Sequence, residues 1–128
     1  MEFKELYDRA MSVVNPRKLT DHTEAGFVGA AILSESGNVY LGVNIDSDCS
    51  VGFCAEHAAI AAMVTAGENV ITKVVAVNAD GKILPPCGRC REFMSQLSEK
   101  NMEAEVMVNE NTILKIKDLL PFDWKAVK

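Results

Sequence analysis

Two short cysteine motifs constrain this chain more than any other feature of its sequence. Cys54-Ala55-Glu56 is followed further along by Pro86-Cys87-Gly88-Arg89-Cys90. Three thiolates can fill three positions of a tetrahedral Zn²⁺ and leave the fourth for a water. A Glu two residues after the first ligand can lie beside that water and shuttle its proton without binding the metal. The motifs therefore predict one Zn²⁺ per chain, held by Cys54, Cys87 and Cys90, with Glu56 as the catalytic acid–base.

The spacing of the cysteines also predicts how helices hold them. Cys87 and Cys90 are three residues apart, so on a helix both sulfurs lie on one face, one turn apart. Cys54 is expected near the start of an Ala-rich helix. Helix starts offer free backbone N–H groups and the positive end of the dipole, which stabilise thiolates. Two helix N-termini directed at one point would thus hold three anionic sulfurs around one cation.

The hydrophobic pattern predicts alternating helices and strands. Apolar residues between Phe3 and Val14 recur at helical spacing and stop before Asn15-Pro16. The further expected elements are a hairpin (27–33 and 39–45), a buried helix (53–66) closed by Gly67, a strand (70–77), a helix (87–97), a strand (104–108) and an ambiguous segment (112–116). This order favours a mixed sheet with helices on both faces. The length predicts a single domain over residues 1–128.

Composition and charge indicate which kinds of binding partner and which cellular compartment to expect. The formal net charge is −5, which makes DNA or RNA a poor partner because phosphate neutralisation carries most of that affinity. The polar start contains no signal peptide, and no apolar run approaches the ~20 residues that span a bilayer. We therefore expect a cytoplasmic protein with a small-molecule substrate, no membrane partner, and cysteines that bind metal rather than form disulfides.

Together with further short motifs, the two cysteine motifs resemble the cytidine deaminase family, in its small form with Cys as first zinc ligand. The further motifs are Val28-Gly29-Ala30-Ala31, Gly42-Val43-Asn44 and Leu119-Leu120-Pro121. The resemblance implies a three-layer α/β/α sandwich with a mixed five-stranded sheet, and a homotetramer. It also implies a hydrolase of pyrimidine salvage that acts on a cyclic amidine C–N bond. Such an enzyme converts free cytidine or deoxycytidine into uridine or deoxyuridine and ammonia.

The resemblance carries several substrate-binding roles onto this chain. In the family, an Asn and a Glu two residues later hold the ribose hydroxyls. Here these positions are Asn44 and Asp46, and Asp is shorter by one methylene. The backbone N–H groups of Ala55 and Cys87 and the carbonyl of Pro85 would orient the ring and its exocyclic nitrogen. These roles are implied by the family and not by spacing.

Two departures from the family pattern concern an aromatic residue and a charge. The family Phe that packs on the pyrimidine corresponds to Gly26, which leaves the neighbouring Phe27 as a ring contact or a core residue. Family members often carry Arg directly after the motif Glu, where it can offset thiolate charge. Here that residue is His57, for which a core or interface role is favoured. Arg89 and Arg91, which flank Cys90, are the expected substitutes.

Other interpretations of the motifs remain open at this point. A blasticidin S-type aminoacylnucleoside deaminase shares the Cys-Gly-Arg-Cys-Arg run and a Trp after Leu-Leu-Pro, here Trp124. A structural knot of four thiolates would add Cys49 to the three predicted ligands. A thiol redox pair would use Cys87 and Cys90 alone. Metal content separates the last two from the catalytic site. In the tail, Phe122 and Trp124 are expected to pack on a neighbouring subunit.

Overall fold

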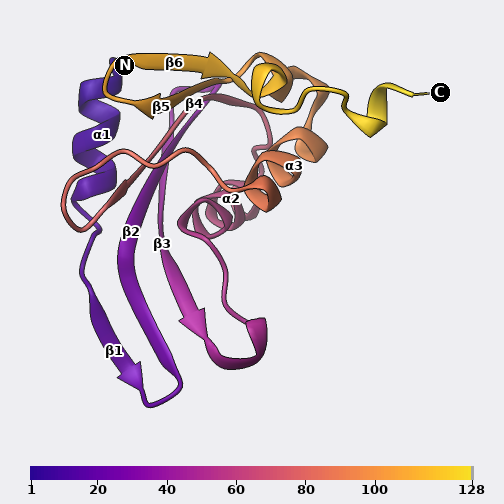
Figure 1. The fold of residues 1–128 in the computed structure, drawn as a ribbon. Coiled ribbons are helices and arrows are strands. Elements are labelled where there is room, and N and C mark those ends of the chain that lie inside the picture. The colour runs from indigo at the N-terminus through magenta and orange to yellow at the C-terminus, as the bar shows by residue number, and fades with distance from the viewer. Residues whose placement is uncertain (128) are drawn as a thin grey trace.

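The computed structural model describes residues 1–127, which form one six-stranded sheet and three α-helices (Figure 1). The helices are α1 (Phe3–Met11), α2 (Ala55–Thr65) and α3 (Gly88–Leu97). The strands are β1 (Arg17–Thr20), β2 (Thr23–Ser34), β3 (Val39–Ser47), β4 (Ile71–Asn78), β5 (Glu105–Asn109) and β6 (Thr112–Lys115). Short 3₁₀ turns are η1 (Asp48–Ser50), η2 (Glu99–Glu103), η3 (Ile116–Leu119) and η4 (Trp124–Ala126). Within the described residues, no helix has the length and apolar character needed to cross a membrane.

β2 is the central strand of the sheet. It pairs antiparallel with β3 along one side. Along its other side, residues 23–25 pair with β1 and residues 28–34 pair with β4, so β1 and β4 share one flank. β4 pairs parallel with β5, and β5 pairs antiparallel with β6. The α/β class and the mixed sheet expected from the sequence are therefore confirmed.

The number of strands differs from the expectation, because the sheet has six strands and not five. The additional strand is β1, for which the sequence predicted no element. All four of its residues are exposed. A strand with no buried face shows no alternation of apolar and polar residues, and that alternation is the sequence signal for a strand. The pairing with β2 alone defines it.

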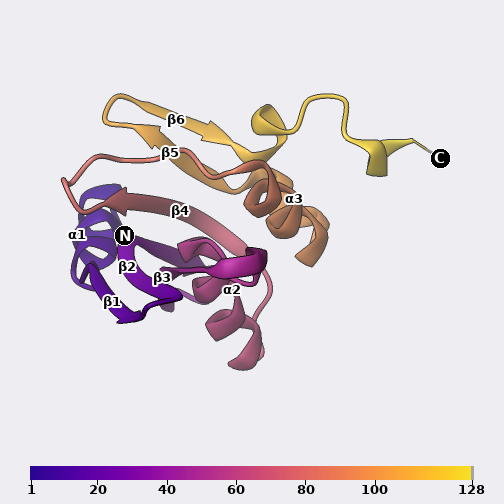
Figure 2. The same cartoon turned by 60° about the horizontal axis from the view of Figure 1, so that its bottom comes forward.

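The helices form a layer on each face of the sheet (Figures 1 and 2). α1 packs through Leu6 and Ala10 on one face, while α2 and α3 pack on the other. Side chains of a strand alternate between the faces, so Ile32 of β2 joins the α2 and α3 side, whereas its neighbours Ala31 and Leu33 join the α1 side. Full burial of each such large apolar side chain contributes about 1.5–3 kcal/mol. The fold is thus the expected three-layer α/β/α arrangement.

The C-terminal end of α2 is tied to the β2–β3 turn. Gly67 follows the helix with φ of +92°, a conformation that closes helices, as predicted. The carboxylate of Glu68 then accepts hydrogen bonds from the Ser36 hydroxyl, the Tyr40 hydroxyl and the Asn38 amide. These donors lower the pKa of Glu68 to about 2. The contacts hold α2 in place at the end away from its N-terminus.

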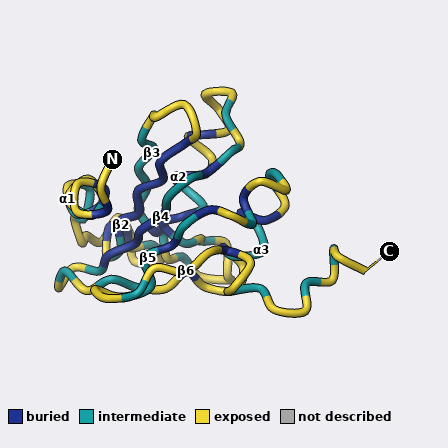
Figure 3. Tube along the Cα trace, turned by 90° about the horizontal axis from the view of Figure 1, so that it is seen from above, coloured by how far each residue is buried: buried dark blue, intermediate teal, exposed yellow. Residues whose placement is uncertain are grey.

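The segment after Pro121 leaves the body of the molecule and is largely exposed, whereas β2 and β4 are the buried centre (Figure 3). Phe122 and Trp124 are both exposed. The indole N–H of Trp124 and the ammonium of Lys125 donate to Glu92 of α3, at 3.3 and 2.9 Å. These polar contacts connect the Trp124 segment to α3 and leave the rings of Phe122 and Trp124 exposed in the single chain.

Candidate active site

The first turns of α2 and α3 bring the predicted zinc ligands together. Cys54 is the N-cap residue of α2, Cys87 is the N-cap residue of α3, and both have extended backbone. Cys90 lies in the first turn of α3 and is buried. An N-cap position places a side chain beside free N–H groups and the positive end of the helix dipole. The site is thus built from two helix starts, which is the arrangement that the spacing predicts.

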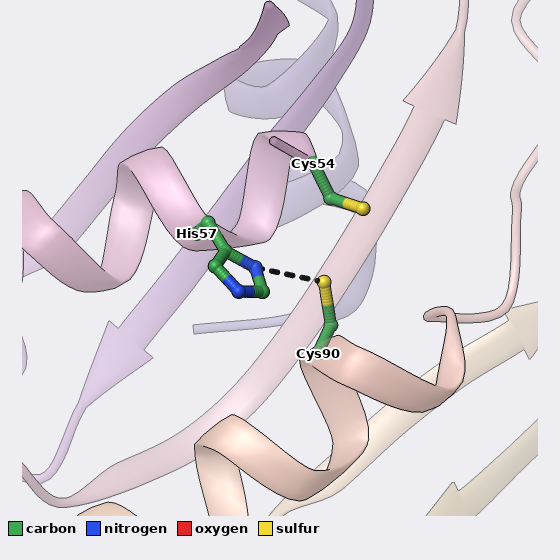
Figure 4. A group of neighbouring side chains, drawn as sticks. All are labelled: Cys54, His57 and Cys90. Atoms are coloured by element: carbon green, nitrogen blue, oxygen red, sulfur yellow. Dashed lines mark hydrogen bonds between the residues drawn. The ribbon is translucent and has the colours of Figure 1, made fainter. Parts of the chain in front are cut away.

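The sulfur atoms lie in direct contact. The Sγ of Cys87 is 3.3 Å from that of Cys54 and 3.4 Å from that of Cys90. His57 Nδ1 lies 3.2 Å from Cys90 Sγ (Figure 4). The ligand atoms of Cys54, His57 and Cys90 all lie within 4.8 Å of one another. Thiolate and imidazole are the donors that Zn²⁺ prefers in proteins, so this donor set fits zinc.

Burial and mutual contact shift the ionisation of the three thiols. Burial, with a hydrogen bond to Cys87, raises the pKa of Cys54 to about 11. Burial and the charge of Glu56 also raise the pKa of Cys90. At Cys87 burial opposes ionisation, but hydrogen bonds from the Cys90 backbone and from the neighbouring thiols lower its pKa. Because several adjacent thiolates are unfavourable without a compensating cation, the cluster suits a bound metal ion.

Glu56 lies in the first turn of α2, two residues from Cys54. Glu56 is only 4% exposed, and it lines the same cavity as Cys54 and Cys87. Burial raises the pKa of Glu56, although a hydrogen bond from its own backbone N–H works in the opposite direction. A carboxyl group with a raised pKa exchanges protons more readily near neutral pH than an exposed one. The structure thus places a buried carboxyl group of raised pKa at the cavity where the motif predicts the acid–base.

His57 is a residue for which the sequence favoured a different role. It faces a sulfur of the cluster, and its ring is near those of Phe53 and Phe93, with centroid distances of 6.5 and 4.8 Å. Burial, together with the nearby positive charge of Arg89, lowers the pKa of His57. The structure thus shows the sulfur contact that the sequence analysis placed second, while an interface role for this half-buried residue stays a prediction. The family preference for Arg at this position was the available signal that the side chain points at the thiolates.

The two arginines expected to offset thiolate charge make other contacts. The guanidinium of Arg91 donates to the carbonyl oxygens of Pro86 and Leu119, at 2.8 and 3.4 Å. It therefore joins the loop before α3 to the segment before the tail. Arg89 is exposed at the rim of the cavity. Among the described residues, the hydrogen bonds made by these two side chains include none to sulfur.

A cavity of about 440 Å³ opens in front of the sulfur cluster. It lies between the middle of β2, the C-terminal end of β3, the starts of α2 and α3, and the segment that follows β4. The predicted substrate-binding residues Asn44, Asp46, Ala55 and Pro85 line it. The structure therefore gathers these four residues around one space, next to Glu56.

Asn44 and Asp46 are linked to each other and to β2. The buried Asn44 amide accepts a hydrogen bond from the Val28 N–H at 2.8 Å and donates to Asp46 Oδ2 at 3.0 Å. Asp46 itself is exposed at the cavity. Its carboxylate is thus oriented by a neighbour while it remains open to a ligand.

Phe27, the other predicted substrate contact, does not line the cavity. The pairing of β2 with β3 shifts register between Ala25 and Gly29, and Gly26 has φ of +84°. A Cβ at Gly26 would lie 2.1 Å from the Asn15 carbonyl oxygen, so only glycine fits this close approach. The irregularity changes which side chain faces the cavity, so that Val28 lines it and Phe27 is 38% exposed.

Cys49 lies apart from the cluster of sulfurs. It is exposed in η1, with φ of +60°. Among the described residues, the sulfur–sulfur contacts join Cys54, Cys87 and Cys90 and do not include Cys49. The arrangement gives no support to a four-thiolate knot. It also leaves a thiol redox pair without an explanation for Cys54 and Glu56.

Comparisons with known proteins agree with this geometry. The family model described as the cytidine and deoxycytidylate deaminase zinc-binding region matches residues 4–105, which include both cysteine motifs. Cytidine deaminase of Mycobacterium tuberculosis is 30% identical over 95 residues, covering 73% of this chain and 69% of that protein. Cytidine deaminase of Halalkalibacterium halodurans is 31% identical over 103 residues, covering 77% of each.

Solved structures show the same architecture. The crystal structure of cytidine deaminase from Mycobacterium tuberculosis matches with a TM-score of 0.81 and 25% identity, over 97% of this chain and 98% of that one. The Mycobacterium leprae enzyme matches in fold with a TM-score of 0.79 at 24% identity, over 94% of this chain and 98% of that one. The fold and the site thus define a zinc-dependent deaminase. The chain belongs to the cytidine and deoxycytidylate deaminase family, and zinc is its cofactor.

Proposed function

We propose that this chain catalyses the hydrolytic deamination of free cytosine nucleosides, converting cytidine or deoxycytidine into uridine or deoxyuridine and ammonia. The observation that carries the proposal is the convergence of three cysteine sulfurs and the buried Glu56 on one cavity. The relatives that match this chain over both motifs are named cytidine deaminases, which supports the same chemistry.

The zinc ligands in this proposal are Cys54, Cys87 and Cys90. Cys87 is chosen over His57 because its sulfur contacts both other sulfurs, whereas His57 contacts Cys90 alone. When bound, zinc acts as a Lewis acid that lowers the pKa of a water and so supplies a nucleophile at neutral pH.

Glu56 is the proton carrier of the reaction. It accepts a proton from the water that adds to C4 of the ring and passes it to N3. It then takes the remaining proton from the hydroxyl group at C4 and gives it to the departing amine, which leaves the C4 carbonyl and ammonia. Burial of its carboxyl raises the pKa of Glu56, which favours both taking up and giving back a proton. The same position, two residues from Cys54, keeps the carboxyl beside the sulfurs without making it a ligand.

Substrate binding is assigned to the opposite side of the cavity. Asn44 and Asp46 hold the sugar hydroxyls, with the Asp46 carboxylate oriented by the Asn44 amide at 3.0 Å. The backbone N–H groups of Ala55 and Cys87 and the carbonyl of Pro85 orient the base, as the family resemblance implies. Ala55 and Cys87 are suited to this because N–H groups at the start of a helix lack partners within the helix.

The charge of the thiolates is offset by His57 in this proposal. Its Nδ1 lies 3.2 Å from Cys90 Sγ, and the tautomer that carries the proton on Nδ1 would donate to the thiolate; the nearby rings of Phe53 and Phe93 pack against the imidazole. Arg91 instead orders the loop before α3 through its bond to Pro86, and Arg89 acts at longer range from the rim.

We further propose that the chain, folded as one domain over residues 1–128, works as a cytoplasmic homotetramer in pyrimidine salvage. Two surfaces support assembly. After Glu56 and His57, α2 is apolar from Ala58 to Val64, and Val64 is 47% exposed. The tail adds the exposed Phe122 and Trp124. The free state of all four cysteines fits a reducing compartment. Sedimentation of the full chain near four times its monomer mass is expected, and a monomer would contradict the proposal.

Metal analysis together with a substrate panel tests the proposed function. The panel contains cytidine, deoxycytidine, cytosine, blasticidin S and adenosine, followed by ultraviolet absorbance. We expect deamination of the first two nucleosides and one zinc per chain. Zinc should be lost in Cys54→Ala, Cys87→Ala and Cys90→Ala and kept in the matched Cys49→Ser. Turnover of blasticidin S alone would overturn the substrate assignment. Loss of zinc in Cys49→Ser would overturn the catalytic site in favour of a closed knot.

A further inference from the structure

Phe53 is the aromatic side chain of the active-site cavity. Among the Phe, Tyr and Trp residues of the described chain, it alone lines the space that also contains Cys54 and Glu56. Phe53 is 36% exposed, so its ring is accessible to a molecule in the cavity. The other lining side chains are aliphatic or polar, such as Val28 and Leu84. Within the described part of a single chain, a stacking contact with a flat ring at this site would therefore come from Phe53.

Backbone contacts fix the position of Phe53. Its N–H donates to the Ile45 carbonyl at 2.9 Å, and the Ile45 N–H donates back at 3.0 Å, which forms an isolated antiparallel bridge to β3. Gly52 permits this close return of the chain, because a Cβ there would lie 2.1 Å from the Ile45 carbonyl oxygen. The residue before Cys54 is thus tied to β3 and has little freedom to leave the cavity.

Phe53 is connected to the residues assigned to both ends of the proposed substrate, the sugar end and the sulfur end. Its backbone partner, Ile45, stands between Asn44 and Asp46, which are assigned to the sugar. Its sequence neighbour is Cys54, at the sulfur end. A nucleoside that reaches from the sugar residues to the sulfurs therefore passes beside Phe53. The His57 ring supports Phe53, with the two planes 23° apart and the centroids 6.5 Å apart.

We infer that Phe53 stacks against the pyrimidine ring of the substrate and selects for a flat heterocyclic base. The inference rests on the proposed function, and it assigns to this chain a base contact that Phe27 does not supply. Stacking of a base on an aromatic side chain changes affinity by about 5- to 100-fold when the ring is removed. Because the contact is the same before and during the reaction, its loss raises KM and leaves kcat within a few-fold.

The test measures binding separately from turnover. Calorimetric titration with uridine, the unreactive product, gives Kd for the full-length zinc-loaded chain, and cytidine turnover gives KM and kcat. The variants are Phe53→Leu, which removes the ring, and Phe53→Tyr, which keeps it. Phe3→Leu is the matched control, because Phe3 belongs to α1 on the opposite face of the sheet. Zinc content is measured for each variant.

We expect Phe53→Leu to weaken uridine binding and raise the cytidine KM by about 5- to 100-fold at wild-type zinc content. Phe53→Tyr and Phe3→Leu should stay within about two-fold of wild type, since stacking needs only the ring. An unchanged Kd in Phe53→Leu, an equal loss in Phe53→Tyr, or a loss that follows zinc release would each overturn the stacking role. A wild type that binds uridine through Phe53 but deaminates nothing would overturn the proposed function alone. A wild type that does neither would overturn both.

Discussion

Gly42 of β3 controls how closely α2 approaches the sheet, so a single methyl group there should disturb the active site from a distance. A Cβ at this position would lie 2.4 Å from the Ala59 nitrogen, 2.6 Å from the Ala58 Cβ and 2.7 Å from the Ala55 carbonyl oxygen. Two of these three atoms belong to the backbone, so no change of rotamer can relieve the clash. Gly42→Ala must therefore move α2 away from β3.

The size of the effect follows from these distances. Ordinary contact begins near 3.4 Å, so the helix and strand must separate by about 1 Å in a tightly packed layer. Overpacking of this kind costs about 1–3 kcal/mol, or roughly 3–10 °C in Tm for a chain of this size. Because Cys54 and Glu56 lie at the start of the displaced helix, kcat/KM should also fall, by up to about 10²-fold for a 1 Å misplacement.

Urea unfolding, zinc analysis and cytidine turnover measure these effects. The matched comparison is Gly88→Ala at the start of α3, where a Cβ would meet no atom within 4 Å. Alanine favours helix over glycine, so Gly88→Ala should match wild-type stability or exceed it by up to about 1 kcal/mol. If Gly42→Ala showed the urea midpoint and turnover of the wild type, the close packing of α2 on β3 would not be what positions the site.

Four further substitutions test single contacts. Glu56→Gln should keep zinc and stability but lower kcat by about 10²–10⁴-fold or more, and turnover within a few-fold of wild type would remove Glu56 from the mechanism. Asp46→Ala should cost roughly 1–2 kcal/mol of cytidine binding, and an unchanged KM would assign Asp46 to the surface. His57→Phe keeps an aromatic ring but removes the nitrogen at the sulfur cluster, so zinc affinity or activity should fall by about 10–100-fold in a chelator competition. Glu68→Gln tests pH dependence. Hydrogen bonds, that of Ser36 foremost, hold the folded pKa of Glu68 at about 2, below its ordinary value. Its stabilising effect is therefore complete above about pH 5 and is lost as the pH falls toward 2. The difference in urea midpoint between wild type and variant should shrink over that range, and a constant difference would contradict the argument.

The sequence predicts the parts of the site whose cause is local. Cysteines three residues apart share a helix face, and prolines before Cys87 mark a helix start, so the contact between Cys87 and Cys90 needs no knowledge of the rest of the fold. The Ala-rich helix was expected over 53–66 and spans Ala55–Thr65. Boundaries at this precision suffice to place Cys54 and Glu56 in the first turn.

Contacts between distant segments could not be predicted in the same way. His57 reaches Cys90 because α2 packs beside α3, and these two residues are 33 positions apart in the chain. Phe53 reaches the cavity because Gly52 allows the chain to return to Ile45. Phe27 is turned away by an irregular register near Gly26. Each outcome depends on a tertiary contact that leaves no periodic trace in the sequence.

The contacts that His57 and Arg91 make determine which groups can stabilise the negative charge of the proposed metal site. In the proposed ligand set, three thiolates around one Zn²⁺ would leave one net negative charge, which weakens a Lewis acid. The nearest cationic candidate by sequence, Arg91, is engaged by the carbonyl oxygens of Pro86 and Leu119. What faces the sulfurs instead is His57 Nδ1 and the N-termini of α2 and α3. Burial, together with the charge of Arg89, lowers the pKa of His57 and so favours its neutral form. In the proposed site, hydrogen bonds and helix dipoles rather than a cation would spread the thiolate charge, so the chemistry would depend on how closely α2 approaches α3.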